Sequence, residues 1–425
     1  MPEIDDNALL TQSGPGAPMG ALLRRYWQPI ALAEEVPTGS APVPLRIMGE
    51  DLVLFRDEHG RLGLLDRACS HRCADLSYGR IEDGGLRCLY HGWLFDIQGK
   101  CLEQPGEPPE SNFKDEIKHK SYSVHEASDI VFAYMGPGDP PVFPDFEFLQ
   151  VDEDYRTVHK AHLECNFLQA CEGEFDPAHV SYLHRRMTDK ANRPAIRGAA
   201  EGKDAANYLA EGLRPEMQFE MTDYGVRILT TRPAEPGKKY LRVTNYILPT
   251  MAAIAGRQAG DGYTAIWRVP VDDENHLRFG VQFQRSKPID RERFDAVNKA
   301  EITSDYRLIR NQRNRYLQDQ TAMSEENFTG MGPLFLVQDA FAAETQGPIH
   351  DRSREHLGTT DMVIQRVRRI LRDAIKTVER GEDPPNVFRD KGAAGLDDLV
   401  VIDEIVDADT DCSAFVKTRL AEAAE

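Results

Sequence analysis

Two short Cys–His pairs place the tightest constraint on how this chain can fold. Cys69 and His71 form the first pair, and Cys88 and His91 form the second, with sixteen residues between His71 and Cys88. Thiolate and imidazole groups are common ligands of zinc and iron in proteins. We therefore expect two loops that meet at one metal site, each loop supplying one sulfur and one nitrogen.

Two kinds of metal site fit this ligand set. A tetrahedral zinc ion takes two Cys and two His ligands, and a Rieske [2Fe–2S] cluster takes two Cys on one iron and two His on the other. The histidines of a zinc finger usually follow both cysteines, whereas here each loop carries one ligand of each kind. The order of the ligands therefore favours the cluster.

The segment around the second loop, LRCLYHGWLFDIQGKC (86–101), reads as a strand, a loop and a strand. With its Y-H-G-W sequence it resembles the Rieske domain of ring-hydroxylating oxygenases. Ser70 stands where that family usually has proline. Cys73, an extra thiol beside the first loop, is expected to be a small buried residue.

A second group of polar residues lies in NFLQACEGEFDPAHVSYLH (166–184), which places Asp176, His179 and His184 on a predicted helix, with Asp176 and His179 on one face. Two histidines and a distant carboxylate form the facial triad of non-haem Fe(II) oxygenases. The pattern D-x-x-H-x4-H, about ninety residues after a Rieske motif, also resembles the oxygenase alpha subunits of this family. The resemblance is closest to the phthalate dioxygenase and aromatic O-demethylase branch.

The resemblance implies a role for each of these residues. His179 and His184 become ligands of a mononuclear Fe(II). Asp176 becomes a bridge that accepts hydrogen bonds from His179 and from a Rieske histidine, His91, of a neighbouring subunit. The third iron ligand is expected far downstream, where Asp339 matches the position that the family uses and Asp351, beside arginines, is the alternative.

Candidates for contact with a substrate are fewer. Asn166 and Gln169 lie upstream on the same predicted helix and are candidates for lining the iron pocket, although packing or helix capping explains them equally well. Arg242, in YLRVTNYILP, is a candidate for binding a substrate carboxylate, because a guanidinium group offers that group a bidentate match. A salt bridge at the rim of a strand explains Arg242 equally well.

The rest of the chain divides into two predicted domains. PLRIMGEDLVLFRDEHGRLGLLD (44–66) alternates apolar and polar residues and predicts a β-meander. A segment rich in Pro and Gly predicts a boundary near residue 150. We therefore expect an all-β Rieske domain with an N-terminal helix over residues 1–150, and a catalytic domain over residues 151–425.

The catalytic domain is expected to be α+β. Four alternating segments between residues 224 and 285 predict a central antiparallel sheet, and helical patterns surround it. The resemblance implies a helix-grip-like arrangement of these elements. The acidic tail from Gly381 is expected to be irregular, with a short last helix.

The composition of the chain bears on where the protein is located and on the partners that it can bind. The formal net charge of −19 argues against a nucleic acid or an anionic membrane as partner. The absence of a long apolar run and of a signal peptide predicts a cytoplasmic protein, whose seven cysteines are reduced and available to metals.

The two motifs together imply a terminal oxygenase that oxidises an aromatic acid with O2. The reaction is either O-demethylation or a cis-dihydroxylation of the phthalate dioxygenase type. The resemblance further implies a separate NAD(P)H-dependent reductase, in some systems with a ferredoxin, and a homotrimer or a dimer of trimers. The alternatives of another class are a Rieske electron carrier without catalysis and a zinc-stabilised binding module.

Overall fold

The computed structural model describes residues 6–187, 208–210, 212–255, 261–390, 396 and 398–424. Its N-terminal unit is built on a six-stranded antiparallel sheet with the order β1-β10-β9-β4-β3-β2. The predicted meander is confirmed, because β2, β3 and β4 pair in sequence order. The strands of this sheet are β1 (Trp27–Leu32), β2 (Val43–Ile47), β3 (Glu50–Arg56), β4 (Leu62–Asp66), β9 (Ser121–Ala127) and β10 (Ile130–Tyr134).

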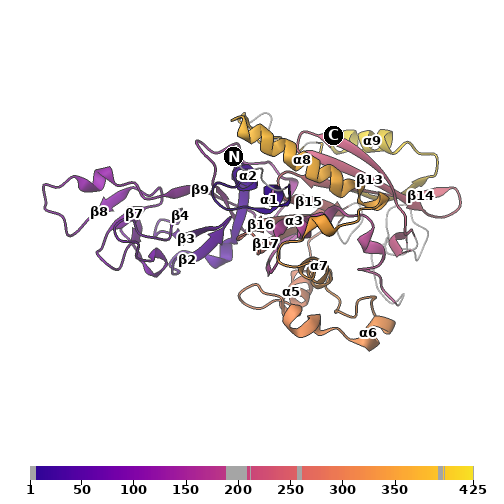
Figure 1. Cartoon of the computed structure of the whole chain (residues 1–425), viewed down its shortest axis with the longest axis horizontal. Helices are drawn as coiled ribbons and strands as arrows, with labels where there is room; N and C mark the ends of the chain where they lie inside the picture. Colours follow the sequence, from indigo (N-terminus) through magenta and orange to yellow (C-terminus); the bar gives the residue numbers. More distant parts are fainter. Residues whose placement is uncertain are drawn as a thin grey trace.

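A smaller four-stranded sheet carries the two Cys–His loops at one end of the molecule (Figure 1). The first loop follows β4, and the second loop connects β6 to β7. Leu76, Leu86 and Phe95 form a separate apolar core that includes Cys69 and Cys88. The strands of this sheet are β5 (Arg80–Glu82), β6 (Gly85–Arg87), β7 (Leu94–Asp96) and β8 (Cys101–Glu103).

The second unit contains an eight-stranded antiparallel sheet with the order β11-β17-β16-β15-β14-β13-β12, and β18 pairs with β14 beside this path. The predicted α+β class with a central antiparallel sheet is therefore confirmed. Its strands are β11 (Arg156–Leu163), β12 (Glu216–Thr222), β13 (Gly225–Pro233), β14 (Lys238–Ile247), β15 (Met251–Ala255), β16 (Tyr263–Pro270), β17 (His276–Phe283) and β18 (Ile402–Asp407).

Helices cover this sheet and join it to the start of the chain (Figure 1). α3 packs on β14, β15 and β16 and against α7, while α8 packs on β13. The N-terminal helices α1 and α2 pack against α8, so they lie on the second unit. The helices are α1 (Asp6–Thr11), α2 (Pro18–Leu23), α3 (Phe167–Phe175), α5 (Arg291–Lys299), α6 (Gln320–Glu325), α7 (Phe335–Glu344), α8 (Met362–Glu379) and α9 (Cys412–Ala424). None of the helices described here is long and apolar enough to cross a bilayer.

Two expectations about secondary structure were wrong. The helix predicted to run through residues 166–184 ends at Phe175, and Asp176 adopts extended dihedral angles. Pro177 explains this, because proline disfavours the helical conformation of the residue before it. The tail beyond Gly381 is also more regular than expected, since it contains β18 in addition to the last helix α9.

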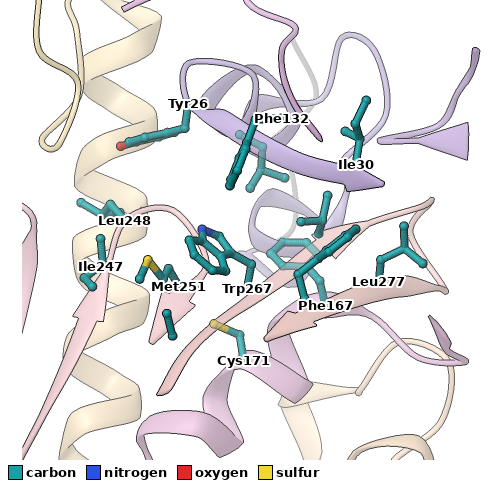
Figure 2. Close-up of a cluster of buried hydrophobic side chains, with 14 of the residues drawn as sticks. Tyr26, Ile30, Phe132, Phe167, Cys171, Ile247, Leu248, Met251, Trp267 and Leu277 are labelled. Carbon is teal, nitrogen blue, oxygen red and sulfur yellow. The ribbon is translucent and has the colours of Figure 1, made fainter. Parts of the chain in front are cut away.

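Trp267 of β16 lies where the two units meet (Figure 2). Its ring packs edge to face on Phe132 of β10, on Phe146 and on Phe148, with ring centroids between 5.5 and 6.2 Å away. Cys171 of α3 belongs to the same buried cluster. One apolar core therefore runs from the Rieske-side sheet through β16 to the helix that precedes the candidate iron ligands.

Substitution of Trp267 is expected to loosen both units together. We expect Trp267→Ala to lower the free energy of unfolding by about 3–5 kcal/mol, because it removes a large buried ring from three aromatic neighbours. Urea unfolding followed by circular dichroism measures the loss. Met221→Ala, at a position that is 60% exposed, is the control and should stay close to the parent. Equal stability of the two variants would contradict a shared core.

Candidate active site

The four predicted cluster ligands lie together at the tip of the N-terminal unit. Cys69 and Cys88 are buried, at 1% and 3% exposure, while His71 and His91 are exposed. The two imidazole rings are 4.4 Å apart between centroids. A Rieske cluster needs this division, with one iron held by inner thiolates and the other by outer imidazoles. The residues present therefore fit the cluster.

Backbone hydrogen bonds shape both loops. The amide N–H of Cys73 donates to the Cys69 carbonyl at 2.8 Å, and that of Gly92 donates to the Cys88 carbonyl at 3.1 Å. Gly92 has a positive φ of 75°, which favours glycine. Trp93 stacks on His71 with centroids 4.6 Å apart. Cys73 was expected to be buried, and this was wrong, because its place at the turn of the first loop leaves it exposed.

Burial raises the pKa of the Cys69 thiol to about 11, and the adjacent Cys88 adds to this effect. Without a metal, Cys69 is therefore a neutral thiol at pH 7. Iron must displace its proton when it binds.

The second predicted site is also assembled. His179 and His184 follow α3, Asp339 lies on α7, and one ligand atom from each lies within 4.8 Å of the others. The Asp339 Oδ1 atom is 3.0 Å from His184 Nε2 and 3.9 Å from His179 Nε2. Within the described part of the chain, this is the one such group of three His, Cys or acidic side chains.

Hydrogen bonds orient both imidazole rings toward one point. The His179 Nδ1–H group donates to the backbone carbonyl of Asp176 at 2.8 Å. The His184 Nδ1–H group donates to Gln338 Oε1 at 2.8 Å, and the Gln338 amide is itself fixed because it donates to the Gly332 carbonyl at 3.0 Å. Each ring therefore uses Nδ1 in its hydrogen bond, which makes Nε2 the atom that faces Asp339 and would bind a metal.

Gln338 was not predicted from the sequence. Its only signal is its place beside Asp339 on α7, and neither residue type nor spacing links it to His184.

The charges at this site favour a bound cation. Burial alone would raise the pKa of Asp339, but the neighbouring His184 outweighs this effect and lowers the pKa to about 2. Burial lowers the pKa of His179, and the proximity of His184 adds to this. A carboxylate that stays ionised and two imidazoles with fixed tautomers are the donor set that Fe(II) takes in a facial triad. The residues therefore fit a mononuclear iron.

Asp176 lies between α3 and the histidines, with its side chain 20% exposed. Its Oδ1 atom accepts a hydrogen bond from the Ala178 amide at 2.7 Å. Its Oδ2 atom is 3.7 Å from His179 Nδ1, which is too far for a hydrogen bond. The backbone carbonyl of Asp176 thus holds His179, and one carboxylate oxygen stays available to another group.

Three other predicted residues make contacts of a structural kind. Asn166 caps α3 by accepting from the Leu168 amide at 3.0 Å, and it donates to the carbonyls of Thr11 and Asp273. Gln169 donates to the Ala343 and Gly347 carbonyls and accepts from the His350 amide. The exposed Asp351 caps a short turn through Ser353.

Arginines of the central sheet share the face that carries α3. The Glu174 carboxylate at the end of α3 accepts from Arg268 Nε at 3.1 Å and lies 3.6 Å from Arg278 Nε. The strand register pairs Arg268 with Arg278, so both side chains leave the sheet on one face. Arg242 is half-buried on β14 and lies near the carboxylate of Asp403 on β18. The Tyr240 hydroxyl donates a hydrogen bond to the same carboxylate.

Comparison with known protein families identifies both units. Residues 26–122 match the model "Rieske [2Fe-2S] domain", and residues 133–424 match "LigXa C-terminal domain like". The oxygenase subunit of phthalate 4,5-dioxygenase from Pseudomonas putida is 37% identical, over 89% of this chain and 87% of that protein. The oxygenase subunit of 5,5'-dehydrodivanillate O-demethylase from Sphingobium sp. (strain NBRC 103272 / SYK-6) is 36% identical, over 92% of this chain and 84% of that protein.

Solved structures share the fold. Dicamba monooxygenase bound to dicamba aligns with a TM-score of 0.58 at 19% identity, over 85% of this chain and 99% of that one. The terminal oxygenase of carbazole 1,9a-dioxygenase from Nocardioides aromaticivorans IC177 also gives 0.58, at 21% identity, over 87% of this chain and 98% of that one. These matches extend through the second unit, which an electron carrier or a zinc module would not need. The chain belongs to the Rieske non-haem iron oxygenases, as an oxygenase subunit of the phthalate dioxygenase and aromatic O-demethylase branch.

Proposed function

We propose that this oxygenase subunit oxidises an aromatic acid, by O-demethylation or by ring hydroxylation, with O2 and with electrons from a separate reductase. The observation that carries the proposal is the convergence of His179, His184 and Asp339, with Nδ1 of each ring hydrogen-bonded elsewhere and both Nε2 atoms directed at Asp339. The two similar proteins described above are named for an aromatic diacid dioxygenase and for an O-demethylase, and together they support both reactions.

Each side chain has a defined task in this proposal. Cys69, His71, Cys88 and His91 would hold the cluster, and His179, His184 and Asp339 would hold Fe(II). When bound, the two groups supply one-electron transfer and the activation of O2. Gln338 and the Asp176 carbonyl orient the two histidines through Nδ1, and the Asp339 carboxylate faces both Nε2 atoms.

Arginines on the face of the sheet that α3 covers bear on whether the substrate is an acid. The pairing register places Arg242 on the same face as Arg268 and Arg278. Glu174 and Asp339 lie near Arg268 and Arg278, and Asp403 lies near Arg242, so each of these guanidinium groups has a carboxylate in its surroundings. We propose Arg242 as the group that binds the substrate carboxylate.

Assembly of several copies follows from two exposed apolar surfaces. The cluster end carries exposed Tyr78, Leu89, Tyr90 and Phe113, and the iron side carries exposed Tyr182, Met187, Phe328 and Phe335. Exposed apolar side chains that gather in this way mark interfaces. Because the two sets differ, pairing one with the other joins copies head to tail, which gives a ring when the rotation between copies closes. We propose a homotrimer or a dimer of trimers.

In this ring of subunits, the Asp176 carboxylate would have a second hydrogen-bond partner. The Asp176 Oδ2 atom, for which the described residues offer no hydrogen bond, would accept one from His91 of a neighbouring subunit, which links the cluster of one copy to the iron of the next. Within one chain the cluster sheet and α7 lie in different units, at separate parts of the molecule (Figure 1).

External partners supply the electrons. Oxygenases of this fold have been solved in complex with a ferredoxin, and subunits of this type work with reductase and ferredoxin partners. We propose a reductase that uses NAD(P)H. We also propose a cytoplasmic location, since all seven cysteines are free thiols.

Removal of the Asp339 carboxylate is expected to empty the iron site selectively. We expect Asp339→Ala to lose about one iron per chain, because two neutral imidazoles alone bind Fe(II) weakly, and to keep the visible spectrum of the cluster. Metal analysis and absorption spectroscopy measure both. Asp351→Ala, which removes the alternative carboxylate, is the control and should retain all iron. Loss of iron from Asp351→Ala with iron retained in Asp339→Ala would instead identify Asp351 as the third iron ligand.

Substitution of Asp176 is expected to separate metal binding from turnover. Asp176→Asn should hold both metals, since the backbone carbonyl that orients His179 is unchanged, and should lower turnover by about 100-fold or more because a carboxamide replaces the bridging acceptor. Steady-state assays with reductase and metal analysis measure the two properties. Asp223→Asn, at an exposed turn, is the control. A parent-like rate in Asp176→Asn would contradict the bridge.

A single turnover tests the reaction itself. Protein reduced under anaerobic conditions is mixed with a panel of aromatic and methoxylated aromatic acids, O2 is admitted, and products are identified by mass. We expect loss of CH2 with release of formaldehyde from a methoxylated acid, or gain of both oxygens with two hydrogens on a ring. Conversion of the matched uncharged amides at the same rate as the acids would contradict an acidic substrate.

A further inference from the structure

His119 is a buried histidine that no part of the proposed reaction uses. It precedes β9 in the N-terminal unit and is 1% exposed. Its Nε2 atom lies 2.8 Å from the Asp66 backbone carbonyl, and its Nδ1 atom lies 2.6 Å from the Ser70 hydroxyl. Ser70 is the residue between the cluster ligands Cys69 and His71, at the position where the family usually has proline.

The partners of the ring decide where its proton resides. A backbone carbonyl only accepts hydrogen bonds, so the His119 Nε2–H group donates to Asp66. Nδ1 then has a lone pair and accepts from the Ser70 hydroxyl. Burial lowers the pKa of His119, which keeps the ring neutral and preserves this order. The hydrogen-bond chain runs from Ser70 through His119 to the Asp66 carbonyl.

These hydrogen bonds tie the start of the first cluster loop and a residue inside it to one fixed point. Asp66 is the last residue of β4, and Ser70 lies inside the loop. His119 is held in turn because its amide donates to the Gly99 carbonyl at 2.7 Å, and its ring stacks on Phe95 with centroids 4.6 Å apart. Any side chain at Gly99 would overlap the His119 carbonyl, so the backbones pack closely there.

The loop held in this way directs donors at a ligand sulfur. The backbone N–H groups of His71 and Arg72 act to lower the pKa of the Cys69 thiol, which is the effect of donors directed at its sulfur. Hydrogen bonds to the sulfurs of an iron–sulfur cluster stabilise the reduced, more negative state and raise the reduction potential. The orientation of residues 70–72 therefore bears on the potential of the cluster.

We propose that His119 is a positioning residue that, through the hydroxyl of Ser70, holds the first loop of the Rieske cluster in the orientation that keeps its reduction potential high. A proline at position 70 would restrict the backbone directly through its ring. In this protein the hydrogen bond from Ser70 to His119 imposes the restriction. The inference concerns the cluster alone and is independent of the substrate and of the proposed reaction.

The test is a redox titration of the intact, cluster-loaded protein, with the EPR signal of the reduced cluster as readout. We expect Ser70→Ala to lower the midpoint potential by about 59 mV, which is a tenfold change in a one-electron equilibrium, with no loss of cluster. His119→Phe, which keeps the ring stacked on Phe95 and removes both nitrogens, should shift the potential in the same direction. Ser70→Pro should return it toward the parent value.

Ser121→Ala is the matched control, because Ser121 donates to the Gln98 carbonyl at 2.7 Å near the same connection but does not touch the first loop. It should keep the parent potential. A parent-like potential and EPR spectrum in Ser70→Ala would overturn the proposal, and this variant decides the matter if His119→Phe fails to assemble the cluster. A Ser70→Pro variant as low in potential as Ser70→Ala would also overturn the positioning role.

Discussion

The geometry of the second unit depends on one constraint, that three polar side chains distant in sequence present their ligand atoms at one partly buried point. His179 and His184 come from the segment after α3, and Asp339 comes from α7. Burial of such groups costs free energy unless each is hydrogen-bonded or ligated. Gln338 and the Asp176 carbonyl offset that cost through hydrogen bonds. The separation of α3 and α7 is fixed because α3 packs on the sheet, with Phe175 on Tyr246, and α7 packs on α3.

The same sheet connects the iron side to the Rieske side. Trp267 packs on aromatic rings of the N-terminal unit, while Arg268, the next residue, leaves the opposite face and binds Glu174 beside the iron ligands. Alternation of side chains along one strand therefore places an apolar anchor and a charged neighbour of the active site on successive residues. The relative position of the two units and the electrostatics of the iron pocket are set by one strand.

Much of this arrangement could be predicted from the sequence. There are physical reasons why the remaining features could not be predicted. Candidate ligands such as Cys69 and His91 can be recognised from residue type and spacing, and the antiparallel sheet from the alternation of apolar and polar residues. The break of the helix before His179 was missed because a 3.6-residue pattern was given more weight than Pro177. Gln338 and His119 could not be found, since an amide or imidazole that orients another side chain leaves no periodic signal. The strand β18 was hidden by its acidic composition, which its pairing with β14 tolerates.

The pairing of β18 with β14 has a consequence for the order in which the two units can fold during translation. Asp403, which accepts from Tyr240 and offsets the charge of Arg242, lies about 160 residues beyond that arginine. All six strands of the Rieske-side sheet have been synthesised once the chain reaches Tyr134. Domains fold as units during synthesis from the N-terminus. On the ribosome, therefore, the Rieske-side sheet can fold while the sheet of the second unit still lacks β18. That sheet is complete only once the chain has been translated beyond Asp407.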